Sequence, residues 1–223
     1  MPTLSSEREL SLKDRAYARI KEQILREELE PNGFLSERGL ARDLGMSNTP
    51  VRLALARLEH EGYVRISPQQ GIVVVALTFE EIVDYIDYRL ALESFVVRQI
   101  AGQLSPGQVE ALRGNLRSQR GVLDGAMPEG EDREALLRMD VAFHLLLASA
   151  FGNRQISRAV ELQHDMLFRV ANRVFRRHPE RLEQSVNEHH DIVEAIVEGA
   201  PGEAVSRIEA HILKIKPLLV GVR

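Results

Sequence analysis

The stretch LSERGLARDLGMSNTPVRLALARLEHEGYV, from Leu35 to Val64, decides the fold of the N-terminal part of the chain. It predicts two short helices joined by a tight turn at Gly45, with Gly62 ending the second helix. Apolar residues recur at helical spacing on one face of each: Leu40, Ala41 and Leu44, then Val51, Leu55 and Leu58. This is the outline of a helix-turn-helix, although a helical hairpin packed only for stability would show the same apolar faces.

The second predicted helix begins with polar side chains. Ser47, Asn48 and Thr49 carry hydroxyl and amide groups, and Pro50 is tolerated in a first turn because the N–H it lacks would have no partner there. Arg52 follows one turn behind Asn48. The second helix of a helix-turn-helix can enter the major groove of DNA, so these side chains are candidates for contacts with base edges or phosphates.

The flanking sequence completes a small domain. A helix is predicted from Leu12 to Leu29, before the two helices already described. After them, residues 63–66 and 72–75 are β-branched runs separated by a loop, which is typical of a hairpin. Three helices and a hairpin predict a winged helix-turn-helix over residues 1–76.

From Thr78 onward the pattern changes to long helices. Thr78 and Glu81 form the sequence signature of a capping box at the start of the first. Six helices are predicted: Thr78 to about Leu104, one from Pro106, Glu131–Ala150, Arg154–Arg177, Pro179–Gly199, and Pro201 to about Pro217. The expected fold class is therefore mostly α, with an all-α six-helix bundle over residues 77–223.

The composition is that of a globular protein from a reducing compartment. Hydrophobic residues make up 44% and charged residues 28% of the 223 residues, and the absence of cysteine excludes disulfides and thiolate metal sites. There is no signal-peptide pattern and no apolar run near the roughly 18 residues of a membrane span, so we expect a soluble cytoplasmic protein. The net charge is −4, and residues 1–76 hold eleven basic and eleven acidic side chains, so bulk charge does not identify a nucleic-acid binder.

The quoted stretch, followed by QQGIVVV from Gln69, resembles the winged helix of the GntR family of bacterial transcription regulators. The helical remainder resembles the ligand-sensing FCD domain of its FadR subfamily. The resemblance implies that DNA is contacted by Arg38, Ser47, Asn48, Thr49, Arg52, Gln70 and Gly71, the last two at the tip of the wing. The family usually has arginine at the position of Asn48 and glutamate at that of Gly39, so we expect a changed operator sequence and a lost capping partner for Ser36.

Three histidines and an aspartate lie on apolar faces of the predicted bundle. Asp140 and His144 are one helical turn apart, and His189 and His211 lie on apolar stripes of two other helices. A single histidine in such a place is usually a core residue, but three with a carboxylate fit a site for Zn²⁺, Ni²⁺ or Mn²⁺. The set also resembles the Asp-x-x-x-His, His, His metal site of many FCD domains, where the carboxylate of an effector reaches the metal.

Arg89 is a candidate for effector binding. It precedes Glu93 by four residues, a spacing typical of an ion pair on a helix surface. It also matches the arginine of the R-x-x-L-E pattern at the start of FCD domains, which implies bidentate binding of an anionic effector. His164 fits either a pocket or the core, and the sequence leaves both readings open.

These features predict a metal-dependent, ligand-responsive transcription regulator, a repressor that binds a double-stranded DNA operator as a homodimer. The expected effector is a small organic or sugar acid that shifts the helical domain between two dimer geometries. One alternative is a metal-dependent hydrolase or lyase with an accessory winged helix, but no HExxH or GxSxG signature is present and we expect no enzymatic activity. Another is a constitutive DNA-binding protein whose histidines only stabilise the bundle.

Overall fold

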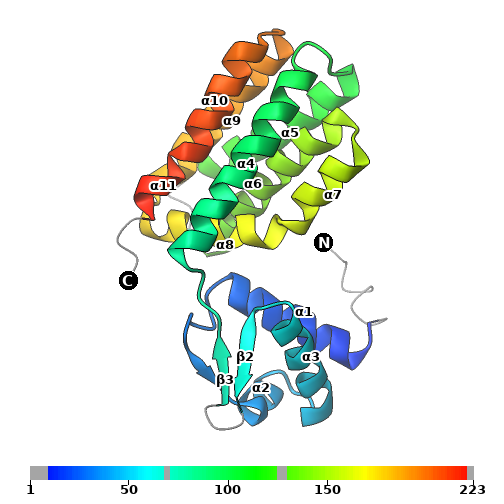
Figure 1. Ribbon diagram of the computed structural model, residues 1–223, viewed down its shortest axis with the longest axis vertical. Coiled ribbons are helices and arrows are strands. Elements are labelled where there is room, and N and C mark those ends of the chain that lie inside the picture. Colours follow the sequence, from blue (N-terminus) through cyan, green and yellow to red (C-terminus); the bar gives the residue numbers. More distant parts are fainter. Residues whose placement is uncertain (1–9, 68–70, 125–129, 220–223) are drawn as a thin grey trace. The chain divides into compact units, whose positions relative to one another are not determined.

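The structure is a computed structural model that describes residues 10–67, 71–124 and 130–219. The chain divides into two compact units, one ending at Leu77 and the other beginning at Thr78. A three-stranded sheet lies in the first unit, and the described part of the second unit is helical (Figure 1). The mostly α fold class, with a winged helix followed by a helical bundle, is confirmed.

The first unit contains α1 (Leu12–Leu25), β1 (Phe34–Leu35), α2 (Glu37–Asp43), α3 (Asn48–His60), β2 (Val64–Ser67) and β3 (Gly71–Val74). Helices α1 and α3 pack together, and Ile20 and Ile24 share one buried core with Leu55 and Leu58. Strands β2 and β3 pair antiparallel as the wing, and β1 pairs with the other edge of β3. The apolar faces predicted from the sequence are therefore the faces that build this core.

Three details of the first unit add to the sequence prediction. Helix α1 ends at Leu25 rather than at Leu29, because Glu27 adopts a left-handed backbone conformation with φ of 57°. Strand β1 was not expected, since two residues are too few to show an alternating pattern. Ser36 still caps α2 by accepting a hydrogen bond from the N–H of Gly39 at 2.9 Å, so glycine removes only the reciprocal half of the capping box.

The second unit contains α4 (Phe79–Ile100), α5 (Pro106–Leu123), α6 (Gly130–Phe151), α7 (Arg154–Leu162), α8 (His164–Arg177), α9 (Glu180–Val197), α10 (Pro201–Leu213) and α11 (Ile215–Leu218). Helix α4 contacts α6, α9 and α10, helix α9 also contacts α6 and α10, and α5 packs on α6 and α9. None of the described helices is long and apolar enough to cross a membrane.

The first bundle helix begins as predicted and ends earlier. Thr78 and Glu81 form both hydrogen bonds of the capping box at the start of α4. The helix ends at Ile100, four residues before Leu104, because Gly102 adopts a left-handed conformation with φ of 71°. This glycine is tightly placed, since an added Cβ would lie 3.1 Å from the Cα of Gly199.

Two of the predicted bundle helices are interrupted. The helix expected from Arg154 to Arg177 is divided into α7 and α8 at Gln163, whose φ and ψ of −95° and 4° are not helical. The last helix is divided into α10 and α11 at Lys214. In the described residues, the six predicted helices therefore correspond to eight, and the bundle architecture stands.

Candidate functional site

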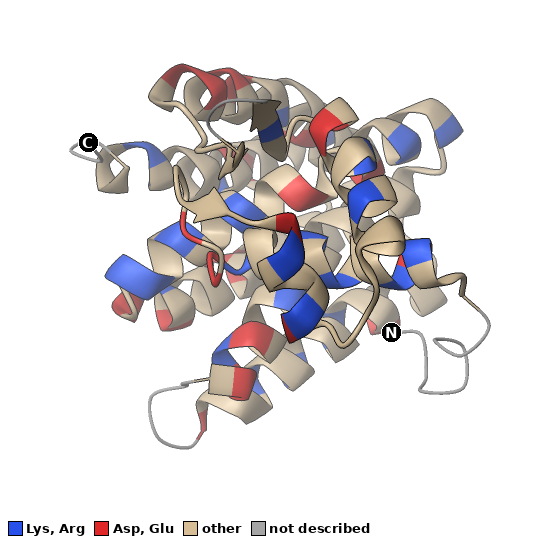
Figure 2. Ribbon diagram, turned by 90° about the horizontal axis from the view of Figure 1, so that it is seen from below, with Lys and Arg blue, Asp and Glu red and all other residues tan. Residues whose placement is uncertain are grey.

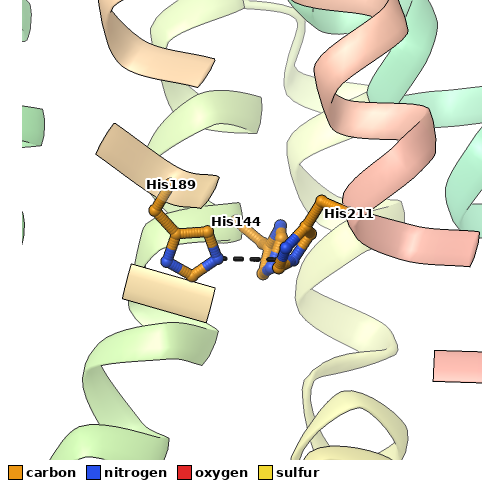
Figure 3. Close-up of side chains that lie close together, drawn as sticks. All are labelled: His144, His189 and His211. Carbon is orange, nitrogen blue, oxygen red and sulfur yellow. Dashed lines mark hydrogen bonds between the residues drawn. The ribbon is translucent and has the colours of Figure 1, made fainter. Parts of the chain in front are cut away.

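Three buried histidine rings from three helices face one another. His144 comes from α6, His189 from α9 and His211 from α10, and none is more than 3% exposed. One nitrogen of each ring lies within 4.8 Å of those of the other two. Nε2 of His189 is 3.3 Å from Nε2 of His211 (Figure 3). The structure thus brings together the three histidines that the sequence singled out; we call them the histidine cluster.

Carboxylates hold two of these rings at Nδ1. Nδ1 of His144 lies 2.6 Å from Oε2 of Glu93, and Nδ1 of His211 lies 2.8 Å from Oε2 of Glu188. Burial raises the pKa of both glutamates, but Arg89 beside Glu93 and His211 beside Glu188 outweigh burial and hold each pKa below its usual range. An ionised carboxylate only accepts hydrogen bonds, so both Nδ1 atoms carry a proton, and Nε2 is the atom that has the lone pair when the ring is neutral.

An amide holds the third ring. Nδ1 of His189 lies 3.3 Å from Oε1 of Gln119. The amide nitrogen of Gln119 donates to Oδ1 of Asn115 at 2.5 Å, and Asn115 in turn donates to the backbone carbonyl of Met139 at 3.1 Å. This chain of donors orients Oε1 of Gln119 as the acceptor for the Nδ1 proton. In its neutral form, each of the three rings then carries its lone pair at Nε2.

Burial keeps the rings of His189 and His211 neutral. Burial lowers the pKa of His189 well below 6.5, and the neighbouring His211 lowers it further. Burial also lowers the pKa of His211, although its hydrogen bond to Glu188 opposes this. Neutral imidazole is the form of histidine that binds metal ions.

Asp140 lies beside the histidine cluster. Its Oδ1 is 3.6 Å from Nε2 of His189 and accepts a hydrogen bond from the hydroxyl of Ser185 at 2.9 Å. The side chain is one helical turn before His144 on α6 and is buried. The carboxylate thus lies beside His189, whereas the group of ligand atoms within 4.8 Å of one another consists of the three histidines.

The donor set fits a divalent transition-metal ion. Zn²⁺ binds histidine nitrogen at about 2.0–2.1 Å, so two nitrogens on one tetrahedral ion are roughly 3.3 Å apart. This matches the separation between His189 and His211. Metal-binding histidines usually donate their second nitrogen to a carboxylate or carbonyl oxygen, as all three do here.

Arg89 forms a buried ion pair against the histidine cluster. Its Nε donates to Oε1 of Glu93 at 2.6 Å, and the two side chains are 3% and 6% exposed. Its Nη2 is 3.1 Å from Nδ1 and 2.9 Å from Nε2 of His144, so the guanidinium lies about equally close to both ring nitrogens. Burial opposes the charge, but Glu93 outweighs it and raises the pKa of Arg89. Arg89 is therefore a charged group of the interior, not of the surface.

Two small cavities adjoin Arg89. Residues of the first include Arg89, Asp140, Arg181, Ser185 and His211, with an apolar wall from α8 and α11. Residues of the second include Tyr85, Arg89, Glu93 and His164. Each has a free volume of about 10 Å³, roughly the space for one water molecule. His164 thus lines a cavity beside Arg89 but does not belong to the histidine cluster.

The first unit presents its predicted DNA contacts to solvent. The exposed side chains at the start of α2 and α3 include Arg38, Ser47, Asn48, Thr49 and Arg52. Ser47 is the N-cap of α3, but its side chain makes no capping hydrogen bond, so the hydroxyl is not used by the helix. Gly71 is exposed and begins β3 with φ of 81°. Gln70 lies outside the described residues.

Arg52 is held by an acidic side chain of the preceding helix. Its Nε and Nη2 lie 3.1 and 2.9 Å from the two carboxylate oxygens of Glu37, so the contact is bidentate. The arginine side chain is still 71% exposed. Basic and acidic residues are interspersed along the helices (Figure 2), so the placement of single arginines, not bulk charge, defines a DNA-binding face.

Family models match both units of the chain. The model described as bacterial regulatory proteins, gntR family, matches residues 12–74, and the FCD domain model matches residues 84–214. The chain belongs to the GntR family. It is a transcription regulator with a DNA-binding winged helix and an FCD domain.

Individual relatives of this GntR regulator support the same family assignment. An uncharacterized HTH-type transcriptional regulator of Streptomyces ambofaciens is 30% identical over 88% of this chain and 80% of its own length. The HTH-type transcriptional repressor RspR of Escherichia coli strain K12 is 26% identical over 93% of this chain and 88% of its own. Among solved structures, E. coli McbR/YncC shares the fold with a TM-score of 0.73 and 21% identity over 96% of this chain and 100% of that one. Because family and relatives are transcription regulators, the chain is not an enzyme, and the hydrolase or lyase alternative is set aside.

Several residues around the site were not predicted from the sequence. Glu93 was seen only as the ion-pair partner of Arg89, and Gln119 and Glu188 were not singled out. Arg181 and Ser185, which line the first cavity, were also missed. For Glu188, the sequence offers one local indication of a role at the site, because this residue directly precedes His189.

Proposed function

We propose that this GntR regulator is a metal-dependent repressor whose helical unit binds a small organic or sugar acid. Binding of the acid changes the affinity of the winged helix for a two-fold DNA operator, on which the protein acts as a homodimer. The observation that carries the proposal is the histidine cluster itself, because three buried imidazoles have nitrogens within 4.8 Å of one another and each ring is held at Nδ1 by Glu93, Gln119 or Glu188. The packing of an apolar core does not by itself require three buried imidazole rings this close together.

The metal is a divalent ion, Zn²⁺, Ni²⁺ or Mn²⁺, held by Asp140, His144, His189 and His211. The bound ion supplies a Lewis-acidic position at which a carboxylate of the effector binds. Arg89 supports the same choice of ligand, since its charged guanidinium lies against His144 and matches a carboxylate in geometry. An acid that reaches both groups gains charge-assisted contacts inside a buried site.

The names of relatives support two parts of the proposal, namely that the protein is a repressor and that its ligand is a small acid. RspR of E. coli is described as a repressor, and a gluconate operon transcriptional repressor of Bacillus licheniformis is 34% identical over 39% of this chain. Gluconate is a sugar acid. These names support a repressor that responds to a small carboxylate.

The DNA side of the proposal rests on the first unit. The operator contacts are Arg38, Ser47, Asn48, Thr49, Arg52, Gln70 and Gly71. Arg52 and Arg38 are long enough to reach base edges or phosphates, and Asn48 can pair with adenine in the major groove. An effector that binds one dimer geometry more tightly than another shifts the population between operator-competent and incompetent forms.

Metal content and operator binding of matched variants test the proposal. His189 is buried in the cluster, whereas the adjacent His190 is 61% exposed and makes a distinct contact with Asp191. We expect His189→Ala to lose the metal and the response to acids, and to keep operator binding. His190→Ala should keep all three properties. Circular dichroism of both variants verifies that the bundle is folded.

Two results would overturn the proposal. The first is purified protein that binds no divalent metal at micromolar free concentration. The second is an operator affinity that is unchanged by chelation and by every organic or sugar acid tried. Either result would leave the histidines as core residues of a constitutive DNA-binding protein.

A further inference from the structure

Arg181 has a donor that the fold does not use. It lies near the start of α9 and is 5% exposed. Its Nη1 and Nη2 donate to Glu188 at 2.8 and 3.0 Å, and Nη1 also donates to Gln184 at 3.1 Å. Its Nε is buried, and among the described residues no acceptor lies within reach of it. Leaving a buried donor without a partner is unfavourable, so such a group calls for an acceptor from outside the chain.

The cavity beside Arg181 leads to the proposed effector site. Arg181 lines it together with Arg89, Asp140, Ser185 and His211. One wall thus belongs to the metal and effector residues, and another carries a second arginine. Side chains of α8 and α11, among them Phe175 and Ile215, complete the cavity with apolar surface. This lining suits a short carbon chain with a polar group at each end.

The charges around the cavity favour a second anionic group. Glu188 accepts hydrogen bonds from Arg181, His211 and Lys214. Because one negative charge is shared among these three groups, the positive charge of Arg181 is only partly neutralised. Together, Arg89, Arg181 and a divalent ion outweigh the carboxylates of Glu93, Asp140 and Glu188. A buried region with excess positive charge is stabilised by a ligand that brings negative charge.

We propose that Arg181 binds a second carboxylate of the effector through its Nε–H, and that this regulator therefore selects dicarboxylic acids over monocarboxylic acids of the same length. The inference rests on the proposed function, in which a first carboxylate binds at the metal and Arg89. The free volume of about 10 Å³ accommodates roughly one water, so the acid enters by displacing the wall formed by α8. That helix is separated from α7 by the single residue Gln163, whose backbone is not helical.

Succinate and butyrate form the matched probe pair, since they have equal carbon chains and differ in one carboxylate. Binding is measured by calorimetry on the full-length protein loaded with Zn²⁺. We expect wild type to bind succinate about 10-fold or more tightly than butyrate, the effect of one hydrogen bond between charged groups. Arg181→Lys keeps a cation beside Glu188 but lacks the Nε–H of arginine, so the ratio of its affinities for succinate and butyrate should fall toward one.

Lys214→Ala is the control variant. Lys214 contacts the same Glu188 at 2.7 Å but is 54% exposed and does not line the cavity, so its loss should leave the succinate preference intact. Equal binding of the two acids by wild type, or an Arg181→Lys variant that keeps the preference, overturns this inference and leaves the proposed acid sensing in place. If wild type binds neither acid nor any other carboxylate tried, the effector half of the proposed function fails with it. The wild-type comparison holds even if Arg181→Lys does not fold.

Discussion

Replacing Gln119 by leucine tests whether the histidine cluster is oriented for metal binding. The side chain of Gln119 is 1% exposed and accepts the Nδ1 proton of His189, which is fully buried. Leucine has a similar size and removes the acceptor. The proton of His189 then gains most by moving to Nε2, where His211 and Asp140 lie 3.3 and 3.6 Å away. That tautomer has no lone pair at the position where the metal binds.

The magnitude follows from a single buried hydrogen bond. A buried donor that loses its acceptor costs about 1–3 kcal/mol, which is roughly a 5- to 150-fold change in an equilibrium constant. Loss of a side chain that orients a metal ligand typically weakens metal binding by about 10- to 100-fold. We therefore expect Gln119→Leu to bind Zn²⁺ about 10- to 100-fold more weakly than wild type.

Competition with a chromogenic chelator at fixed pH measures this affinity. Gln119→Glu is the rescue variant, because a carboxylate oxygen accepts the same proton and should restore binding to within a few fold. Wild-type affinity in Gln119→Leu would refute the reasoning. Equal losses in the leucine and glutamate variants would refute it too, since packing and not the hydrogen bond would then position His189.

Three further variants test other parts of the structure. Glu93→Gln leaves Arg89 buried without its counter-charge, so urea denaturation should show a free energy of unfolding lower by about 3–5 kcal/mol. Adding Arg89→Met should largely recover this loss, and a loss below about 1 kcal/mol in Glu93→Gln would contradict this account. Arg52→Ala should weaken operator binding by about 1–3 kcal/mol, measured by fluorescence anisotropy, whereas Glu37→Gln frees the same guanidinium and should retain binding. Similar losses in both variants would show that operator affinity depends on the ion pair and not on a contact between Arg52 and DNA. Thr78→Ala removes the capping box of α4 and should cost the metal-free chain about 1 kcal/mol, seen as a lower Tm by circular dichroism; an unchanged Tm would mean that the box adds nothing in solution.

The fold was predictable where one helix face had to be buried. Val51, Leu55 and Leu58 repeat at helical spacing, and burying them against α1 leaves little choice of structure. The breaks were not predictable. Glutamine is compatible with a helix, so Gln163 gives no local sign that α7 and α8 separate there, and Glu27 adopts a left-handed conformation that the sequence would assign to glycine or asparagine.

The site was predictable only in its inner part. The histidines stood out because each interrupts an apolar stripe on its own helix. Their Nδ1 partners lie 51, 70 and 23 residues away in the sequence, on Glu93, Gln119 and Glu188. Such contacts depend on how the helices cross, which side-chain periodicity does not encode.

The histidine cluster draws its groups from five helices: the rings from α6, α9 and α10, and their acceptors from α4, α5 and α9. No unfolded chain holds these groups together, so an ion bound as proposed would act only on the folded state. By mass action, free metal at about 100 times its dissociation constant adds roughly 2.7 kcal/mol to the free energy of unfolding. A larger supply of metal would then lower the fraction of unfolded regulator, which is the form that proteases degrade.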